Sequence, residues 1–330
     1  MRDKPIDPVL LNDWYVLAKA TDLTTGTLLL CRLLGKDLVL WRSETGHLSA
    51  WEDRCPHRSV RLSLGNVVGE TLVCSYHGMA YQAVTGRCVN VPAHPGYVPP
   101  KQACVQQYRV QERYGLIYVC LGEPDRDIPR FPEWEDPAYR CTVAGPYAMR
   151  ANGLRAIENF LDVAHFPFIH TNILGVLENP VIEDYTVSID DHGVYAKDIC
   201  VWQPDPYGTG EGTQVSYDYW AMRPLTAYLR KNNPGGECLT LMYSVTPVEE
   251  DQCIAWMSIA MNYAPELSES EVIAFQDMIT LQDLKNLESH SPQLLPLTSS
   301  IEFSVPSDRT SLAYRKWLKQ LGLTYGVLEG

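Results

Sequence analysis

The sequence predicts an α+β fold in two parts, a small all-β domain followed by a larger domain of long strands flanked by helices. Short apolar or alternating runs fill residues 14–121, and Gly, Asn and Asp turn signals separate them. Longer strand-like runs fill residues 181–263, and three stretches with helical periodicity lie around them. At 330 residues, of which 45% are hydrophobic, the chain is long enough to bury such a core.

The predicted small domain takes residues 1–125, with its core at about 13–121. Its strands are expected in the runs WYVLAKA, TLLLCRLLG, DLVLWR, LSAWEDR, TLVCSYH and RYGLIYVCLG. The segment 126–144 is rich in proline and acidic residues, so we expect a linker there. Residues 145–330 then form the larger domain.

Three helices are expected in the larger domain. In the stretch 155–170, Ile157, Phe160, Leu161 and Ala164 have the spacing of one helical face. The stretch 268–290 starts with a serine cap and an acidic first turn. The last stretch, 308–322, ends on a glycine.

The composition argues against several classes of protein. No window reaches the roughly 18 uninterrupted apolar residues of a membrane span, and the start lacks an apolar run behind a basic stretch. A net charge of −13 disfavours nucleic-acid binding, which needs Lys and Arg at phosphates. The ten cysteines are scattered without a secretory signal, so they do not indicate a disulfide framework. We expect a cytoplasmic protein whose acidic surface suits a cationic ligand or a basic redox partner.

Two cysteine–histidine pairs form the strongest metal-binding pattern. Cys55 and His57 form the first pair, and Cys74 and His77 follow after 16 residues. Two Cys and two His can bind structural zinc, although zinc fingers usually pair Cys with Cys and His with His. One Cys and one His from each of two loops instead fit a Rieske centre, in which two thiolates bind one iron and two imidazoles bind the other. The pattern CPHR…CSYHG therefore predicts a 2Fe–2S cluster.

The cluster motif resembles that of low-potential Rieske proteins. High-potential respiratory Rieske proteins carry an extra cysteine in each loop, and the comparable positions here are Val60 and Ser75. Oxygenases and small ferredoxins have the low-potential type. A Rieske electron carrier is an alternative for this part of the chain, but more than 200 residues follow it.

A second metal motif lies in NFLDVAHFPFIH. Asn159, Asp162 and His165 are spaced by three, so they would share one helix face. His170 would point roughly 140° away on an unbroken helix, but Pro167 can break the helix and return His170 to His165. Alone, two such histidines could simply satisfy core hydrogen bonds. After a Rieske motif, they resemble the pattern N-x2-D-x2-H-x4-H of the Rieske non-heme iron oxygenases, whose iron takes two histidines and one carboxylate.

The third iron ligand must come from elsewhere in the chain. The stretch 271–290 offers Asp277, Asp283 and Glu288 as candidates, and periodicity does not separate the first two. The resemblance of LQDLKNLESHSPQLLP to the family's EDxxxxExQxP segment selects Asp283. The other two acids are then expected at the surface or near the site.

The resemblance covers essentially the whole chain. It is strongest to the vanillate demethylase-like branch of oxygenase alpha subunits, and within it to the cyanobacterial hydroxylases of saxitoxin biosynthesis, a secondary metabolism. It implies a helix-grip, START-like catalytic domain with a large antiparallel sheet. It also implies a monooxygenase that hydroxylates an unactivated C–H bond of a saxitoxin-type guanidinium alkaloid. The alternative is a Rieske N- or O-demethylase of a methylated heterocycle or aromatic compound.

The resemblance also implies cofactors, partners and roles. The cofactors are a Rieske cluster and a mononuclear Fe(II), with O₂ as co-substrate and NAD(P)H acting through a separate ferredoxin or flavin reductase. The family assembles as a homotrimer, in which Asp162 would bridge His165 to a Rieske histidine, His77, of the next chain, with Asn159 beside it. Candidates for lining the substrate pocket are the large residues of the strand region: Trp202, Tyr219, Trp220, Tyr228, Met242 and Trp256.

Overall fold

The computed structural model describes residues 6–206, 208, 210–233, 235–298 and 301–328. The chain divides into two compact units, an N-terminal unit of Leu10–Ile128 and a C-terminal unit of Met1–Val9 with Pro129–Gly330. Within the described ranges, no helix is both long and apolar enough to cross a membrane. All ten cysteines fall in these ranges, and all are free.

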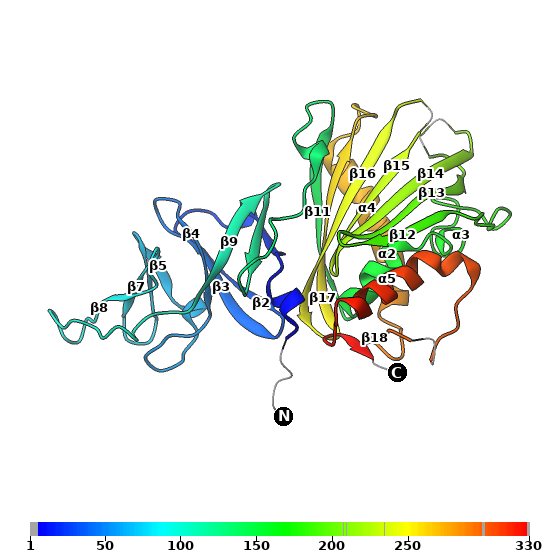
Figure 1. The fold of residues 1–330 in the computed structure, drawn as a ribbon. Helices are drawn as coiled ribbons and strands as arrows, with labels where there is room; N and C mark the ends of the chain where they lie inside the picture. Colours follow the sequence, from blue (N-terminus) through cyan, green and yellow to red (C-terminus); the bar gives the residue numbers. More distant parts are fainter. Residues whose placement is uncertain (1–5, 207, 209, 234, 299–300, 329–330) are drawn as a thin grey trace. The chain divides into compact units, whose positions relative to one another are not determined.

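The N-terminal unit is built from two antiparallel sheets, as its short strand-like runs predict (Figure 1). The larger sheet has the order β1-β10-β9-β4-β3-β2. Its strands are β1 (Tyr15–Lys19), β2 (Leu28–Leu33), β3 (Lys36–Arg42), β4 (Leu48–Glu52), β9 (Gln107–Arg113) and β10 (Leu116–Cys120). The smaller sheet joins β5 (Asn66–Val68), β6 (Thr71–Val73), β7 (Ala80–Gln82) and β8 (Cys88–Asn90) in sequence order. The short helix α1 (Pro8–Leu11) precedes β1.

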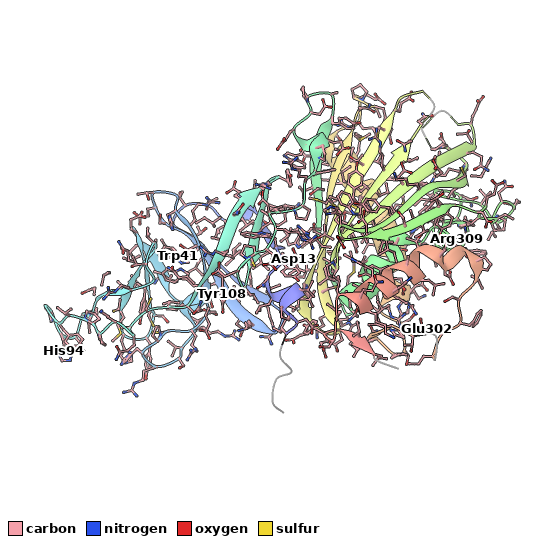
Figure 2. All side chains as sticks on the ribbon, in the orientation of Figure 1. Asp13, Trp41, His94, Tyr108, Glu302 and Arg309 are labelled. Carbon is pink, nitrogen blue, oxygen red and sulfur yellow. The ribbon has the colours of Figure 1, made fainter. Side chains whose placement is uncertain are left out.

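Tight turns close the hairpins of the larger sheet. Leu34 and Gly35 join β2 to β3 with φ values of 50° and 75°. Tyr114 and Gly115 join β9 to β10 in the same way, with φ values of 55° and 70°. Two successive residues at positive φ match the right-handed twist of paired strands, and glycine adopts this conformation without strain. Trp41 of β3, labelled in Figure 2, packs edge to face on Trp51 of β4 in the core of this unit.

The C-terminal unit is organised around a seven-stranded antiparallel sheet of order β11-β17-β16-β15-β14-β13-β12 (Figure 1). The strands are β11 (Arg140–Met149), β12 (Thr186–Asp190), β13 (Gly193–Gln203), β14 (Thr213–Arg223), β15 (Thr226–Asn232), β16 (Cys238–Glu249) and β17 (Gln252–Met261). The expected large antiparallel sheet is thus confirmed. Residues 140–144, expected in the linker, instead form the start of the edge strand β11.

Four helices accompany this sheet: α2 (Gly153–Leu161), α3 (Phe166–Ile169), α4 (Glu269–Leu287) and α5 (Arg309–Gln320). α2 packs on β16, α4 on β11, and α5 on β12 and β13. The serine cap expected for α4 is Ser268, which forms a capping box with Glu271. Asp7 ties the chain start to the end of this unit by accepting from the Thr324 and Tyr325 amides. Two-residue strands β18 (Leu295–Pro296) and β19 (Val327–Leu328) pair beside this contact.

Candidate active site and metal centres

Two loops of the N-terminal unit have the same backbone pattern around a buried cysteine. The amides of Cys55 and Cys74 each donate to the carbonyl oxygen five residues later, at 2.8 and 2.9 Å. The amides of Ser59 and Gly78 donate back to the two cysteine carbonyls, at 2.9 and 3.0 Å. Both donors, four residues after the cysteine, have positive φ values of 58° and 66°. The two halves of the motif therefore fold into equivalent turns despite their different sequences.

The side chains of these turns fit a Rieske cluster. Cys55 and Cys74 are buried, whereas His57 and His77 are exposed, with ring centroids 4.7 Å apart. Burial raises the pKa of the Cys74 thiol, so a metal that binds the thiolate would compensate for this burial. The Tyr81 hydroxyl lies 3.1 Å from Cys55 Sγ. Two buried thiols beneath two surface imidazoles are the donor set of a cluster with an inner Cys-bound iron and an outer His-bound iron.

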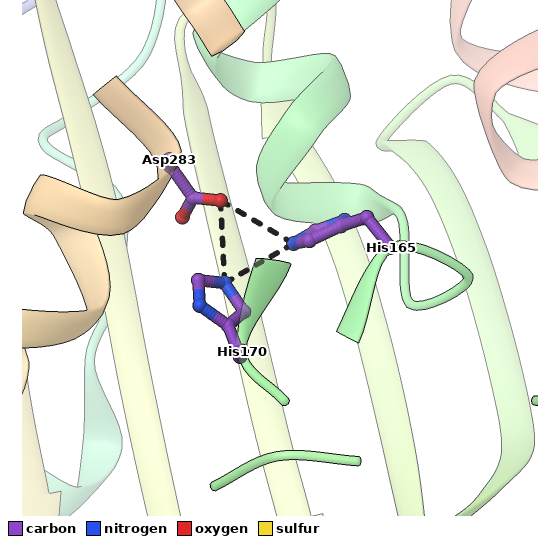
Figure 3. A group of neighbouring side chains, drawn as sticks. All are labelled: His165, His170 and Asp283. Carbon is purple, nitrogen blue, oxygen red and sulfur yellow. Dashed lines mark hydrogen bonds and ion pairs between the residues drawn. The ribbon is translucent and has the colours of Figure 1, made fainter. Parts of the chain in front are cut away.

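The second donor set lies in the C-terminal unit and comes from two distant segments. His165 Nε2 and His170 Nε2 are 3.3 Å apart, and Asp283 Oδ1 lies 3.5 and 3.2 Å from them (Figure 3). Asp283 Oδ1 is buried and has no hydrogen-bond partner among the described residues. Donor atoms bound at right angles to one ion at about 2.1 Å lie about 3 Å apart. The three side chains can therefore hold one metal ion with its remaining positions open.

The helix expected to carry the first histidine ends before reaching it. The sequence reasoning placed Asn159, Asp162 and His165 on one helix face and put the break at Pro167. α2 ends at Leu161 instead, and Asp162 is extended, with φ −89° and ψ 138°. Pro167 lies in the first turn of α3, where its missing N–H has no helical partner to lose. The two histidines meet because the chain leaves α2 before His165.

The other nitrogen of each histidine has its own acceptor. His165 Nδ1 lies 2.9 Å from Asp162 Oδ2, and His170 Nδ1 lies 2.8 Å from Gln282 Oε1. Burial acts to raise the pKa of Asp162, but its hydrogen bond and charge interaction with His165, together with hydrogen bonds from the Ala164 and His165 backbone amides, hold that pKa below its usual value. These contacts favour the tautomer in which both Nε2 atoms are free to bind a metal. The sequence did not predict this role of Gln282, and the only signal that could have indicated it was the position of Gln282 next to Asp283.

The two other acids of α4 have different partners. Asp277 accepts a hydrogen bond of 2.6 Å from the Tyr147 hydroxyl of β11. Glu288 accepts from the Arg150 backbone amide at 2.9 Å. Neither is part of the group formed by the two histidines and Asp283.

The metal-binding group opens into a cavity of about 620 Å³ between the sheet, α2 and α4. Asn159 and His165 both line this cavity. Phe160 also lines it and stacks on Tyr243, with ring centroids 4.8 Å apart. The floor consists of odd-numbered residues of the strands, including Tyr217, Tyr219, Leu229, Lys231, Leu239, Leu241, Ile259 and Met261.

Most of the residues expected to line the pocket lie elsewhere. Of the candidates, only Tyr219 lines the cavity; the described residues around it do not include Trp202, Trp220, Tyr228, Met242 and Trp256. Side chains alternate between the two faces of a sheet, and all of these are even-numbered. Tyr228, for example, donates to Glu133 at 2.7 Å and packs on Phe131. The segment before β11 thus covers the second face, which explains why large residues are buried there too.

Comparison with known proteins finds two domain families in the chain. Residues 13–109 match the Rieske 2Fe-2S domain, and residues 149–324 match the vanillate O-demethylase oxygenase C-terminal domain. The methylxanthine N1-demethylase NdmA of Pseudomonas putida is 33% identical over 298 residues, which are 88% of this chain and 81% of that protein. The solved structure of Pseudomonas putida CBB5 NdmA with caffeine has a TM-score of 0.82 and 29% identity, covering 94% of this chain and 90% of that chain.

A third relative is similar to a shorter part of the chain. The oxidoreductase NdmD of Pseudomonas putida is 42% identical over 114 residues, which are 34% of this chain and 19% of that protein.

Proposed function

This chain belongs to the Rieske oxygenases with a vanillate O-demethylase-type C-terminal domain, and from that premise we propose that it oxidatively demethylates a methylated heterocycle. Members of the family are oxidoreductases that use a Rieske cluster, a mononuclear iron and O₂. The observation that carries the proposal is the group of His165, His170 and Asp283 opening into a large, mainly apolar cavity. The similarity to a methylxanthine N1-demethylase over most of the chain supports an N-methyl substrate.

The overall chemistry follows from this assignment. One oxygen atom of O₂ enters a C–H bond of an N-methyl group, while two electrons and two protons reduce the other atom to water. The resulting N-hydroxymethyl group breaks into formaldehyde and an N–H group. The bound iron supplies the activation of O₂, and the Rieske cluster supplies the electrons.

The chain's own residues hold and shield the reacting centre. His165, His170 and Asp283 would hold the metal at the cavity wall, and O₂ and substrate would reach it through the cavity. Asp162 and Gln282 fix the two imidazoles by hydrogen bonds to their Nδ1 atoms. Aromatic and aliphatic walls exclude water from the substrate.

In this proposal, a separate reductase delivers the electrons, and they pass from one copy of the chain to the next. Asp162 is 28% exposed while it holds His165, so its carboxylate can also accept a hydrogen bond from another molecule. His77 is exposed on the Rieske turn. In a homotrimer, Asp162 of one copy and His77 of the next would complete the electron path. A reductase and a cytoplasmic location agree with electrons that come from NAD(P)H.

Hydroxylation of a saxitoxin-type guanidinium alkaloid is the second candidate. Exposed acids line the cavity at Asp205, Glu266 and Glu271, and they would attract a cation. The two candidates differ in product, because N-demethylation releases formaldehyde and hydroxylation of a ring carbon does not.

The test is turnover by the purified holoenzyme with NADH and a generic reductase. We expect formaldehyde and an N-demethylated product from caffeine, in equal amounts. The His165→Ala variant, which lacks an iron ligand, should give neither. A guanidinium alkaloid of saxitoxin type serves as the competing substrate, and its hydroxylation without any formaldehyde from N-methyl heterocycles would contradict the demethylase assignment.

A further inference from the structure

The cavity floor consists of cross-strand rows in which one residue is charged. The first row crosses β14, β15, β16 and β17 through Tyr217, Lys231, Leu239 and Met261. The second row lies two residues away on each of the antiparallel strands and consists of Tyr219, Leu229, Leu241 and Ile259. Lys231 is thus the single charged side chain of these two rows, and it lies among aromatic and aliphatic neighbours.

Lys231 is buried to a degree that lysine rarely reaches. Its exposed fraction is 7%, and its Nζ donates to the Pro206 carbonyl oxygen at 3.1 Å. Burial lowers its pKa to about 8, so the ammonium form still predominates at pH 7. Because an ammonium group carries three N–H donors, it can hold the Pro206 oxygen and a ligand oxygen at the same time.

A buried amide bonds to the cross-strand neighbour of this lysine. Gln203 is 0% exposed and lines the same cavity. Its Nε2 donates at 2.7 Å to the hydroxyl of Tyr217, which is the cross-strand neighbour of Lys231. Its Oε1 has no hydrogen-bond partner in the part of the chain that the structure describes. A buried acceptor without a donor is unfavourable, and a ligand N–H would remove that deficit.

This polar end of the cavity lies close to the metal-binding group. The Tyr217 ring packs on Phe166 at 5.9 Å, and the Phe166 ring lies 5.0 Å from His165 and 5.8 Å from His170. The two floor rows are separated by about 7 Å, the length of two strand residues. Lys231, Gln203 and the metal-binding group line the same cavity, joined along its wall by Tyr217 and Phe166, so a fused-ring substrate can direct one edge to Lys231 and Gln203 and the opposite methyl group toward the metal-binding group.

We propose that Lys231 and Gln203 form a recognition subsite for the cyclic-amide edge of the substrate, in which Lys231 donates to a ring carbonyl oxygen and Gln203 Oε1 accepts from the adjacent ring N–H. This inference rests on the proposed demethylation and names its substrate class as uncharged oxo-heterocycles. The ammonium group inside the cavity repels a guanidinium ligand. The exposed acids Asp205, Glu266 and Glu271 could attract a cation to the cavity but would leave it facing Lys231.

Binding to the holoenzyme under anaerobic conditions tests the subsite without turnover. The probes are theobromine, which has a ring N–H between two carbonyls, caffeine, which has a methyl group in place of that N–H, and 1-methylbenzimidazole, which has neither. Lys231→Met should weaken binding of both xanthines about tenfold or more and leave 1-methylbenzimidazole unchanged. Gln203→Leu should weaken theobromine more than caffeine. The matched control is Lys197→Met, which removes an exposed lysine of β13 and should change nothing.

The outcomes separate this subsite from the proposed function. Methylguanidinium is the cationic comparison probe. The subsite is overturned if both variants bind the xanthines as the wild type does, if the wild type binds no oxo-heterocycle, or if it binds methylguanidinium more tightly than the xanthines. If binding depends on Lys231 and Gln203 but formaldehyde is never released, the subsite stands and demethylation fails. An unchanged Rieske spectrum and iron content in each variant establish that the fold is intact.

Discussion

Lys231 illustrates at the scale of one residue how a binding group lowers the stability of the fold that holds it. A charged ammonium at 7% exposure loses most of its hydration, and its lowered pKa records that loss. The Gln203 Oε1 is also buried, and it accepts no hydrogen bond from the described residues. A side chain kept only for packing at these positions would be apolar, so removal of the charge should increase stability while it weakens binding.

The stability of Lys231→Met and its pH dependence can be predicted. The pKa of Lys231 is about 8 in the fold against the ordinary value of 10.5, so between these pH values the unfolded chain binds more protons and wild-type stability rises with pH. Below pH 8 the buried ammonium of Lys231 destabilises the fold to its full extent. At pH 7 the variant should gain on the order of 3 kcal/mol in free energy of unfolding. Thermal unfolding should show the gain at pH 7 and a smaller one at pH 10; a less stable variant at pH 7 would contradict the prediction.

A second residue-scale prediction concerns Gln282, which accepts from His170 Nδ1. Gln282→Leu removes this acceptor, so the imidazole can rotate or change tautomer. Affinity for the mononuclear iron should fall about 10- to 100-fold. Iron titration of the metal-depleted site measures it, and the Rieske absorption spectrum should not change. Gln282→Glu keeps an acceptor oxygen and should keep the affinity; equal losses in both variants would show that the contact does not act through His170.

At the scale of elements, α4 presents different faces to the cavity and to the sheet edge. Its cavity-lining residues include Gln276, Ile279, Asp283 and Leu287, which follow the three- and four-residue spacing of one helix face. Asp277 lies about 120° around the helix from Asp283 and bonds to Tyr147 of β11. One helix therefore supplies a metal ligand and a contact with the edge strand.

The two aspartates provide a matched pair of variants. Asp283→Ala should lose the mononuclear iron, so the chain should retain about two of about three irons and both acid-labile sulfides. Asp277→Ala removes a similar carboxylate from the same helix and should keep all of the iron. Iron and sulfide analysis of the purified variants makes the comparison. Loss of iron in Asp277→Ala alone would show that the ligand assignment is wrong.

At the scale of the whole molecule, the chain carries two metal-binding groups in two separate folding units. Cys55, His57, Cys74 and His77 lie in the N-terminal unit, and the mononuclear site lies in the C-terminal unit. Each unit buries its own core, so a variant that disables one site should leave the other intact. This independence permits a complementation experiment.

Mixed assemblies test whether electrons pass between copies. His77→Cys should disable electron entry, and His165→Ala should disable the mononuclear site. If electrons cross from one copy to the next, co-assembled trimers should recover part of the wild-type turnover, because some interfaces join an intact Rieske turn to an intact iron site. Turnover is compared with that of each variant alone. Verified mixed trimers with no added activity would contradict transfer between copies.

The sequence by itself determined the chemistry of both metal groups. Each Rieske turn needs a Cys and a His within a few residues, and the two iron histidines are five apart, so these donors are visible as local patterns. The long strand runs likewise predicted the large sheet. Asp283 lies more than a hundred residues from His170, and only the family resemblance could select it over Asp277.

Only the tertiary structure decided which residues surround the substrate. Both faces of the C-terminal sheet are covered, so large apolar residues occur at odd and even positions alike, and hydrophobicity could not show which face meets the cavity. Lys231, Gln203 and Gln282 have no local pattern that distinguishes them from other polar residues. Their roles depend on contacts between segments far apart in the chain, such as Gln203 with Tyr217 and His170 with Gln282, and these contacts exist only once strands and helices have packed.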